Sequence, residues 1–196
     1  STHNVRYPSI AIDPYSNDVF VAVEREWTSN DHDILVLRYV DGVWSWSAVA
    51  NILGSDDRFP SITSEYSYGG ANWQYVSYEY VYSYNDRDLM FAKSTDHGGN
   101  WSIKKLHGDW PDYNVHTQTS ITNTEGYIYI AYRWGADYDS TCEIRVDRST
   151  DFGNSWTQYK DIDGLSNDCC FPSVAATHGG STVLVAFPVS YTHLTL

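Results

Sequence analysis

Residues 94–101 read STDHGGNW and residues 149–156 read STDFGNSW, so the pattern Ser-x-Asp-x-Gly-x-x-Trp occurs twice. In both copies a short acid can bond turn amides, a glycine permits positive φ, and a tryptophan offers a large ring to bury. The shared positions therefore have a role in folding a hairpin. The fourth position is His97 in one copy and Phe152 in the other, so no shared Ser-Asp-His chemistry is indicated.

The composition is that of a globular β protein. The chain has 196 residues, enough for one domain with a substantial core, and 42% of them are hydrophobic. Its 17 Tyr and 8 Trp favour strands, and no window has a sustained helical period, so we expect an all-β fold. No apolar run is long enough for a membrane span. The formal net charge of −13 argues against a nucleic-acid partner and suits an extracellular protein.

Four internal repeats organise the sequence. They begin with YPSIAID at 7–13, FPSITSE at 59–65, QTSITNT at 118–124 and FPSVAAT at 171–177. A second β-rich segment follows each start, a third follows in the first three repeats, and the octet then leads into a fourth. Four-stranded units of about 52–59 residues are typical of antiparallel β-propeller blades. The alternative, a generic antiparallel sandwich, does not explain copies in matched register.

The repeats predict a single partial propeller over residues 1–196. We place them at about 6–57, 58–116, 117–169 and 170–187, with an atypical tail at 188–196. The fourth repeat stops after its second strand, so about three and a half blades are expected. We expect the first strand of each blade to be short and rich in small residues, as suits a crowded axis. The remaining blades of a closed ring would come from missing sequence or from an oligomer.

The octet resembles the Asp box, or bacterial neuraminidase repeat, of sialidase-like β-propellers. The resemblance extends from residue 1 to about residue 188, and the first repeat has a degenerate copy, YVDGVWSW at 39–46. It is specific for fold rather than activity, since Asp boxes also occur in other glycosidases, sorting receptors and binding modules. In that family the boxes lie at the blade periphery, which implies structural roles for Ser94, Asp96, Gly98, Trp101, Ser149, Asp151, Gly153 and Trp156.

Strand order predicts that function lies at the face opposite the octets. The turns between second and third strands and the links between blades share that face, which contains Arg6 in RYP (6–8) and Arg58 in RFP (58–60). Both resemble the Arg-Ile-Pro motif of sialidases, whose arginine helps to clamp a substrate carboxylate. The family has one such motif per propeller, so a repeated surface arginine is the competing interpretation.

The second strands end in charged residues at equivalent places. These are Glu24, Glu79 and Arg133, and we count Arg133 as a third candidate substrate-binding arginine. Two carboxylates at the same end of the propeller axis could act in glycoside cleavage, one as the general acid and the other as the general base or the nucleophile. Asp33 and Asp88 in the following loops are weaker catalytic candidates. The competing interpretation is solvated strand ends, and no nucleophile pair of tyrosine and glutamate is identifiable.

The same loops are rich in closely spaced acids. Asp31 and Asp33 recur as Asp86 and Asp88, and residues 137–139 read DYD in the third repeat. Carboxylate oxygens suit Ca²⁺, but no loop has the EF-hand pattern. We therefore favour turn formation, with the second acid capping the third strand, over a Ca²⁺ site. No other cofactor is expected.

The three cysteines also fall on this predicted face. Cys142 leads into a third strand, and Cys169 and Cys170 precede the next first strand. We predict that Cys142 pairs with Cys169 or Cys170. A bridge over roughly 27 residues would stabilise the fold by about 3–4 kcal/mol in the chain-entropy picture.

Two functions remain open from the sequence. The first is an extracellular or cell-surface propeller that binds a glycan or a protein. The second is a sialidase-type glycoside hydrolase whose remaining catalytic residues lie outside this chain. The regular repeats favour the first, and the two Arg-x-Pro segments favour the second.

Overall fold

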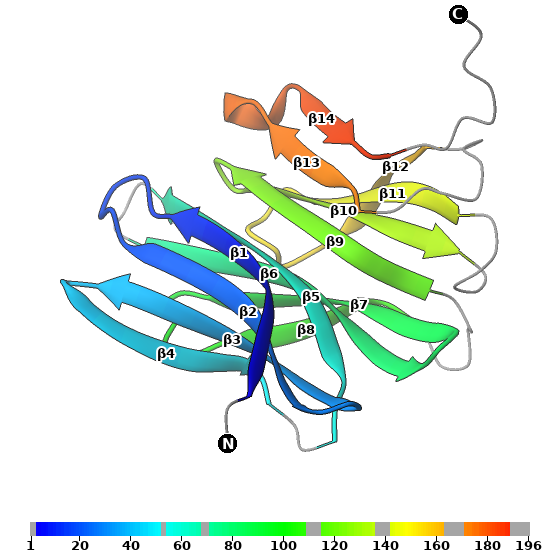
Figure 1. Cartoon of the computed structure of the whole chain (residues 1–196). Helices are drawn as coiled ribbons and strands as arrows, with labels where there is room; N and C mark the ends of the chain where they lie inside the picture. Colours follow the sequence, from blue (N-terminus) through cyan, green and yellow to red (C-terminus); the bar gives the residue numbers. More distant parts are fainter. Residues whose placement is uncertain are drawn as a thin grey trace, which may run out of the picture.

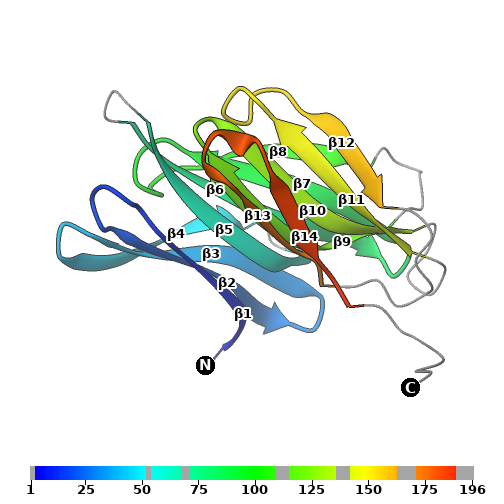
Figure 2. The same cartoon turned by 90° about the horizontal axis from the view of Figure 1, so that it is seen from above.

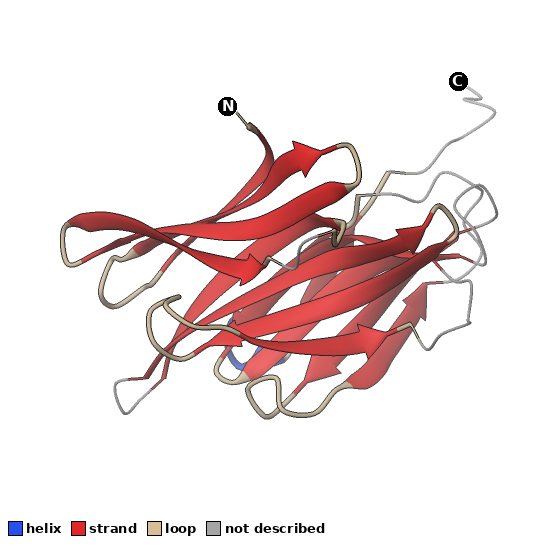
Figure 3. Ribbon diagram, turned by 90° about the horizontal axis from the view of Figure 1, so that it is seen from below, coloured by secondary structure: helices blue, strands red, loops and turns tan. Residues whose placement is uncertain are grey.

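The structure is a computed structural model that describes residues 3–51, 54–67, 71–108, 115–135, 142–162 and 171–188. Its secondary structure is almost entirely β, which confirms the expected fold class (Figure 3). The one helical segment among these residues is a three-residue 3-10 turn, His178–Gly180. Within the same ranges, no helix has the length and apolarity that crossing a membrane would require.

The strands form successive antiparallel sheets. The first sheet contains β1 (Asn4–Ile12), β2 (Val19–Thr28), β3 (Asp31–Val40) and β4 (Val43–Ala50). The second contains β5 (Asp57–Ser67), β6 (Ala71–Ser83), β7 (Asp86–Ser94) and β8 (Ser102–His107). The third contains β9 (Val115–Thr124), β10 (Tyr127–Gly135), β11 (Cys142–Ser149) and β12 (Thr157–Ile162). A fourth pair contains β13 (Ser173–Ala176) and β14 (Val183–Ala186).

These sheets are arranged as the blades of a propeller. The first strands contact one another in order, β1 with β5, β5 with β9 and β9 with β13, so they line the inner side (Figures 1 and 2). A single parallel pairing of Arg87 with Val115 joins the second blade to the third, so β5 to β12 form one continuous eight-stranded sheet. The first strands are 9, 11 and 10 residues long in the first three blades, so the expectation that they are short was wrong. They are long because they extend past a bulge to pair with the end of the second strand, as Asn4 does with Glu26.

The core lies between blades rather than within one sheet. The first interface contains Phe20, Ala22, Ile34 and Val36 from the first blade and Ile62, Val76, Tyr78 and Ala92 from the second. The second contains Tyr75, Leu89 and Phe91 against Ile121, Ile128, Ile130 and Tyr132. Alternate residues of each strand point to opposite faces, so a blade with two covered faces needs apolar residues on both.

A repeated serine joins neighbouring first strands. Each serine hydroxyl oxygen accepts a hydrogen bond from a backbone N–H of the next blade. The pairs are Ser9 with Ile62 at 3.1 Å, Ser61 with Ile121 at 3.2 Å and Ser120 with Val174 at 3.1 Å. The shared serine of the repeat therefore supplies an acceptor as well as a small side chain.

Candidate functional site

The registers of the inner strands bring the sequence-predicted arginines and glutamates together. Arg6 is the Cα partner of Glu24 in the first blade, and Arg58 is the partner of Glu79 in the second. At the same place in the third blade, Arg133 pairs with Thr117. Each pair lies towards the turn from the second strand to the third, so charged side chains from three blades lie at this end of the molecule.

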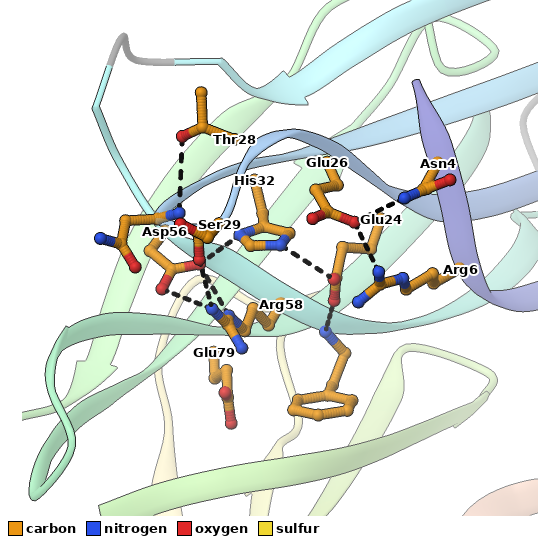
Figure 4. A network of polar contacts seen from close by, with 12 residues as sticks. Asn4, Arg6, Glu24, Glu26, Thr28, Ser29, His32, Asp56, Arg58 and Glu79 are labelled. Atoms are coloured by element: carbon orange, nitrogen blue, oxygen red, sulfur yellow. Dashed lines mark hydrogen bonds and ion pairs between the residues drawn. The ribbon is translucent and has the colours of Figure 1, made fainter. Parts of the chain in front are cut away.

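A polar network joins the first blade to the link before the second (Figure 4). The imidazole Nδ1 of His32 lies 2.7 Å from Asp56 Oδ1, and its Nε2 lies 3.8 Å from Glu24 Oε1. Asp56 accepts two hydrogen bonds from Arg58, at 2.7 Å from Nε and 2.9 Å from Nη2. A backbone hydrogen bond from His32 N to Ser55 O holds the link against the turn. The link residue Asp56 thus fixes both His32 and Arg58.

Glu24 is buried inside this network, with 1% of its surface exposed. Burial raises the pKa of Glu24, against the opposing effects of the Phe59 backbone N–H and of the charges on His32, Arg58 and Arg6. Its Oε2 accepts a hydrogen bond from Phe59 N at 3.2 Å. The interpretation of a solvated strand end was wrong, because the link and the next blade cover the carboxylate.

Glu79 is more deeply buried, with no exposed surface. Its Oε1 accepts a hydrogen bond from Arg87 Nη1 at 2.7 Å, while Oε2 has no hydrogen-bond partner among the described residues. Burial outweighs the attraction of Arg87 and raises the pKa of Glu79 to about 7. Glu79 is therefore also not a solvated strand end.

The candidate arginines differ in their access to solvent. The Arg6 side chain is 48% exposed and lies 2.6 Å from Glu26, which also accepts a hydrogen bond from Asn4 at 3.0 Å. The Arg58 side chain is 28% exposed and is held by Asp56, so it is no free surface arginine. Arg133 is buried. Arg6 is thus the candidate arginine best placed to meet a ligand.

The weaker acidic candidates are bound by protein cations. Asp33 is buried within β3 and accepts hydrogen bonds from Arg25 at 2.7 Å and from Trp27. Asp88 is buried within β7 and lies 3.0 Å from Lys105 Nζ. Neither caps its strand as expected, since β3 begins at Asp31 and β7 at Asp86.

The calcium and cysteine predictions are only partly within the described residues. In those residues no three His, Cys, Asp or Glu side chains are grouped to hold a metal ion. The segment 137–139 and the cysteines Cys169 and Cys170 lie outside the described residues. Cys142 begins β11, and its predicted bridge stays a prediction.

The octets lie at the other end of the strands. Strand β7 runs from Asp86 to Ser94, so its octet is nine residues, roughly 30 Å, from the charged end. Ser94 Oγ donates to Asp96 Oδ1 at 2.8 Å and accepts from Gly98 N at 2.9 Å. Asp96 Oδ1 also accepts from Asn100 N at 2.8 Å.

The second octet has the same turn with a different tryptophan contact. Ser149 donates to Asp151 at 2.8 Å and accepts from Gly153 N at 2.8 Å. Trp156 Nε1 donates to Gly153 O at 3.1 Å within its own octet. The corresponding Trp101 Nε1 instead donates to Ser47 Oγ of the preceding blade, at 3.0 Å.

The sequence interpretation missed a cavity of about 220 Å³ where the four first strands converge. Its lining consists of the residue pairs that follow the arginine positions: Tyr7 and Pro8, Phe59 and Pro60, Gln118 and Thr119, and Phe171 and Pro172. The strand register shifts at the first two of these pairs. Proline suits such a bulge because it has no backbone N–H, so the interrupted ladder leaves no donor there without a partner. The repeated aromatic-proline pairs were visible in the sequence, but their convergence depends on the packing of the blades.

The comparisons with known proteins support the fold. No protein-family model matches the sequence, and no curated protein matches it. Solved structures do match, among them Hadza microbial sialidase Hz136, with 15% identity, a TM-score of 0.66, and coverage of 93% of this chain and 42% of that one. A GH93 α-L-arabinofuranosidase of Fusarium graminearum in complex with arabinobiose has 13% identity, a TM-score of 0.61, and coverage of 88% and 53%. A Trypanosoma rangeli sialidase mutant displaying trans-sialidase activity has 13% identity, a TM-score of 0.62, and coverage of 96% and 34%. This chain therefore has the fold of sialidase and glycoside hydrolase β-propellers and spans about half or less of these three chains.

Proposed function

We propose that this chain is a glycan-binding module of a sialidase-like propeller and that it acts outside the cell. The observation that carries the proposal is the position of Arg6: its side chain, paired with Glu26, is about half exposed, and the residue directly precedes Tyr7, which lines the axial cavity. A guanidinium offers a planar fork of donors that matches a carboxylate and also bonds hydroxyls. Sialidases among the solved structures of the same fold make an acidic sugar a reasonable first ligand.

Burial of the two glutamates favours binding over catalysis. Glu24 is engaged by Phe59 N and His32, and Glu79 is engaged by Arg87. A catalytic acid or nucleophile must come within hydrogen-bond reach of the substrate. Neither carboxylate has the exposed surface that such contact needs.

The test is calorimetric titration of the chain with sialyllactose and with lactose. We expect binding of sialyllactose, and a loss of about tenfold in affinity for Arg6→Ala because a charge-assisted contact is removed. Lys160→Ala is the matched control, since Lys160 is an exposed cation on the outer strand β12. An equal loss for both variants would indicate a nonspecific effect of charge and contradict the proposal.

Binding of a protein at the same face is the alternative outcome of this titration. If sialyllactose and other glycans fail to bind while a protein ligand is captured in a manner that depends on Arg6, the module is a protein-binding propeller. With a formal net charge of −13 the molecule repels anionic partners at long range, so an anionic group of a protein ligand would have to be bound locally, by a cation such as Arg6.

A glycoside hydrolase is the second candidate, favoured by the raised pKa of Glu79. A carboxyl group with a pKa of about 7 has the value of a general acid at neutral pH. In that case a longer protein would supply the remaining catalytic residues and the remaining blades, and a rearrangement would have to expose Glu79, which is fully buried in this chain. Turnover of a fluorogenic sialoside by such a protein, lost in Glu79→Gln, would support hydrolysis; we expect no turnover by the present chain.

A further inference from the structure

The lining of the axial cavity has an unusual backbone. Tyr7, Phe59, Gln118 and Phe171 occupy the same place in the four blades and have φ of +49°, +51°, +55° and +48°. Large aromatic residues rarely adopt this left-handed region, which suits glycine and, less well, asparagine. Three aromatic rings in strained positions around one cavity point to a use for the rings themselves.

Side chains of preceding blades hold this backbone in place. Glu24 Oε2 accepts the hydrogen bond of Phe59 N at 3.2 Å, and Gln118 Oε1 accepts that of Phe171 N at 3.0 Å. The strained residues are therefore fixed by bonds from outside their own strands. Such positions persist only when their surroundings over-determine them. Glu24 is thus a positioning residue for Phe59.

The rings remain accessible in spite of this support. Tyr7 is 46% exposed and Phe171 is 61% exposed, and the rings of Tyr7 and Phe59 lie 4.5 Å apart between centroids. Rings that served only the core would be covered, as Tyr75 and Tyr78 are. The face of an aromatic ring is electron-rich and attracts the slightly positive C–H groups of a ligand.

We propose that this cavity binds one saccharide ring, with its C–H face stacked on Tyr7 and Phe171. This inference rests on the proposed function and adds the contact that recognises the sugar ring, whereas Arg6 recognises the acidic group. The cavity volume of about 220 Å³ is below the usual range of about 300–1,000 Å³ for drug-sized ligands. A single ring therefore suits it better than a peptide segment.

Glycine substitution separates a binding role from a folding role. Glycine adopts positive φ without strain, so Tyr7→Gly and Phe171→Gly remove a ring while relaxing the backbone. We expect both variants to keep or raise Tm, by up to about 2–4 °C. The matched controls are Asn17→Gly and Asp41→Gly, because these residues also have positive φ, at +61° and +52°, but do not line the cavity.

The binding assay uses sialyllactose and arabinobiose as acidic and neutral probes, with saturation-transfer NMR to identify the ligand protons in contact. We expect Tyr7→Gly and Phe171→Gly to weaken both probes at least about tenfold, and both control variants to bind as the parent does. Arg6→Ala should weaken the binding of sialyllactose only.

Cavity variants that bind both probes normally would overturn the stacking inference, and the proposed function would stand if Arg6→Ala still lost the binding of sialyllactose. Failure of both probes to bind the parent chain, or binding of a proline-rich peptide in their place, would overturn both proposals.

Discussion

The glycines of the two octets differ in how tightly they are enclosed. Both have positive φ, +71° at Gly98 and +81° at Gly153, so alanine at either position is strained by about 1–2 kcal/mol. A Cβ at Gly153 would also lie 2.6 Å from Phe91 Cζ, whereas one at Gly98 would lie 3.5 Å from Phe20. We expect Gly153→Ala to destabilise the fold by about 1–3 kcal/mol more than Gly98→Ala, measured by urea unfolding. Equal losses would mean that Phe91 yields freely.

Buried Glu79 predicts a dependence of stability on pH. Its folded pKa of about 7 lies above the reference value of 4.5. Between pH 4.5 and about 7 the folded state therefore keeps the Glu79 carboxyl protonated, whereas the unfolded state loses that proton. The stabilising contribution is complete below about pH 4.5 and is lost as the pH rises through about 7. We expect the stability of the parent relative to Glu79→Gln to fall by up to about 3 kcal/mol over that window.

A second buried carboxyl group, Asp57, must be controlled for in this experiment. Burial also raises the pKa of Asp57 to about 7, despite a hydrogen bond from Ser55. Its contribution has the same sign and is lost over the overlapping window from 3.8 to about 7, so the comparison is best repeated in an Asp57→Asn background. A difference between parent and Glu79→Gln that stays constant from pH 4.5 to 8 would contradict the prediction.

Among the elements, the third strands of the first and second blades each hold the octet hairpin of the next blade. Lys93 on β7 donates to Phe152 O at 2.8 Å, and Arg38 on β3 donates to His97 O at 3.1 Å. The two cations occupy equivalent places, because Arg38 pairs with Phe20 and Lys93 with Tyr75. This bond between blades is a feature of the repeat that the octet pattern alone does not contain.

Replacing Lys93 with methionine keeps the aliphatic stem and removes the donor. We expect a loss of about 1 kcal/mol and faster hydrogen exchange in the hairpin of β11 and β12, measured by mass spectrometry. Lys160→Met is the control, because Lys160 is exposed on the same hairpin. If both variants exchange alike, the Lys93 bond does not hold the hairpin.

The order of the elements can be predicted from the sequence, whereas the contacts between them cannot. The repeated serine and the octet recur in the same order every 52–59 residues, so the strands and the blade order follow from pattern alone. The contact of His32 with Asp56 does not, because it requires the link before β5 to fold back on the turn before β3. Nor does the burial of Glu79, which depends on the neighbouring blade and on Arg87.

At the scale of the whole molecule, one face of the first blade packs against the second blade, and within the described residues no blade packs on the other face. Its other face carries a groove of about 670 Å³, whose apolar residues include Val21, Val23, Leu35, Leu37 and Trp46. Val21 pairs with Ile10 as Val76 pairs with Ile62, so Val21 and Val76 are equivalent in the repeat. Val76 is fully buried against the first blade, whereas Val21 borders the open groove.

This difference in burial predicts that valine-to-alanine substitutions at the two equivalent positions lower the stability of the fold by unequal amounts. We expect Val76→Ala to cost about 2 kcal/mol and Val21→Ala less than about 1 kcal/mol, measured by urea unfolding of the present chain. A further blade from a longer polypeptide would raise the cost at Val21 towards that at Val76. A second copy seated on the groove would instead make the cost at Val21 increase with protein concentration, because association then contributes to stability. Equal costs at low concentration would contradict the open first blade, since they would require Val21 to be as well packed as Val76.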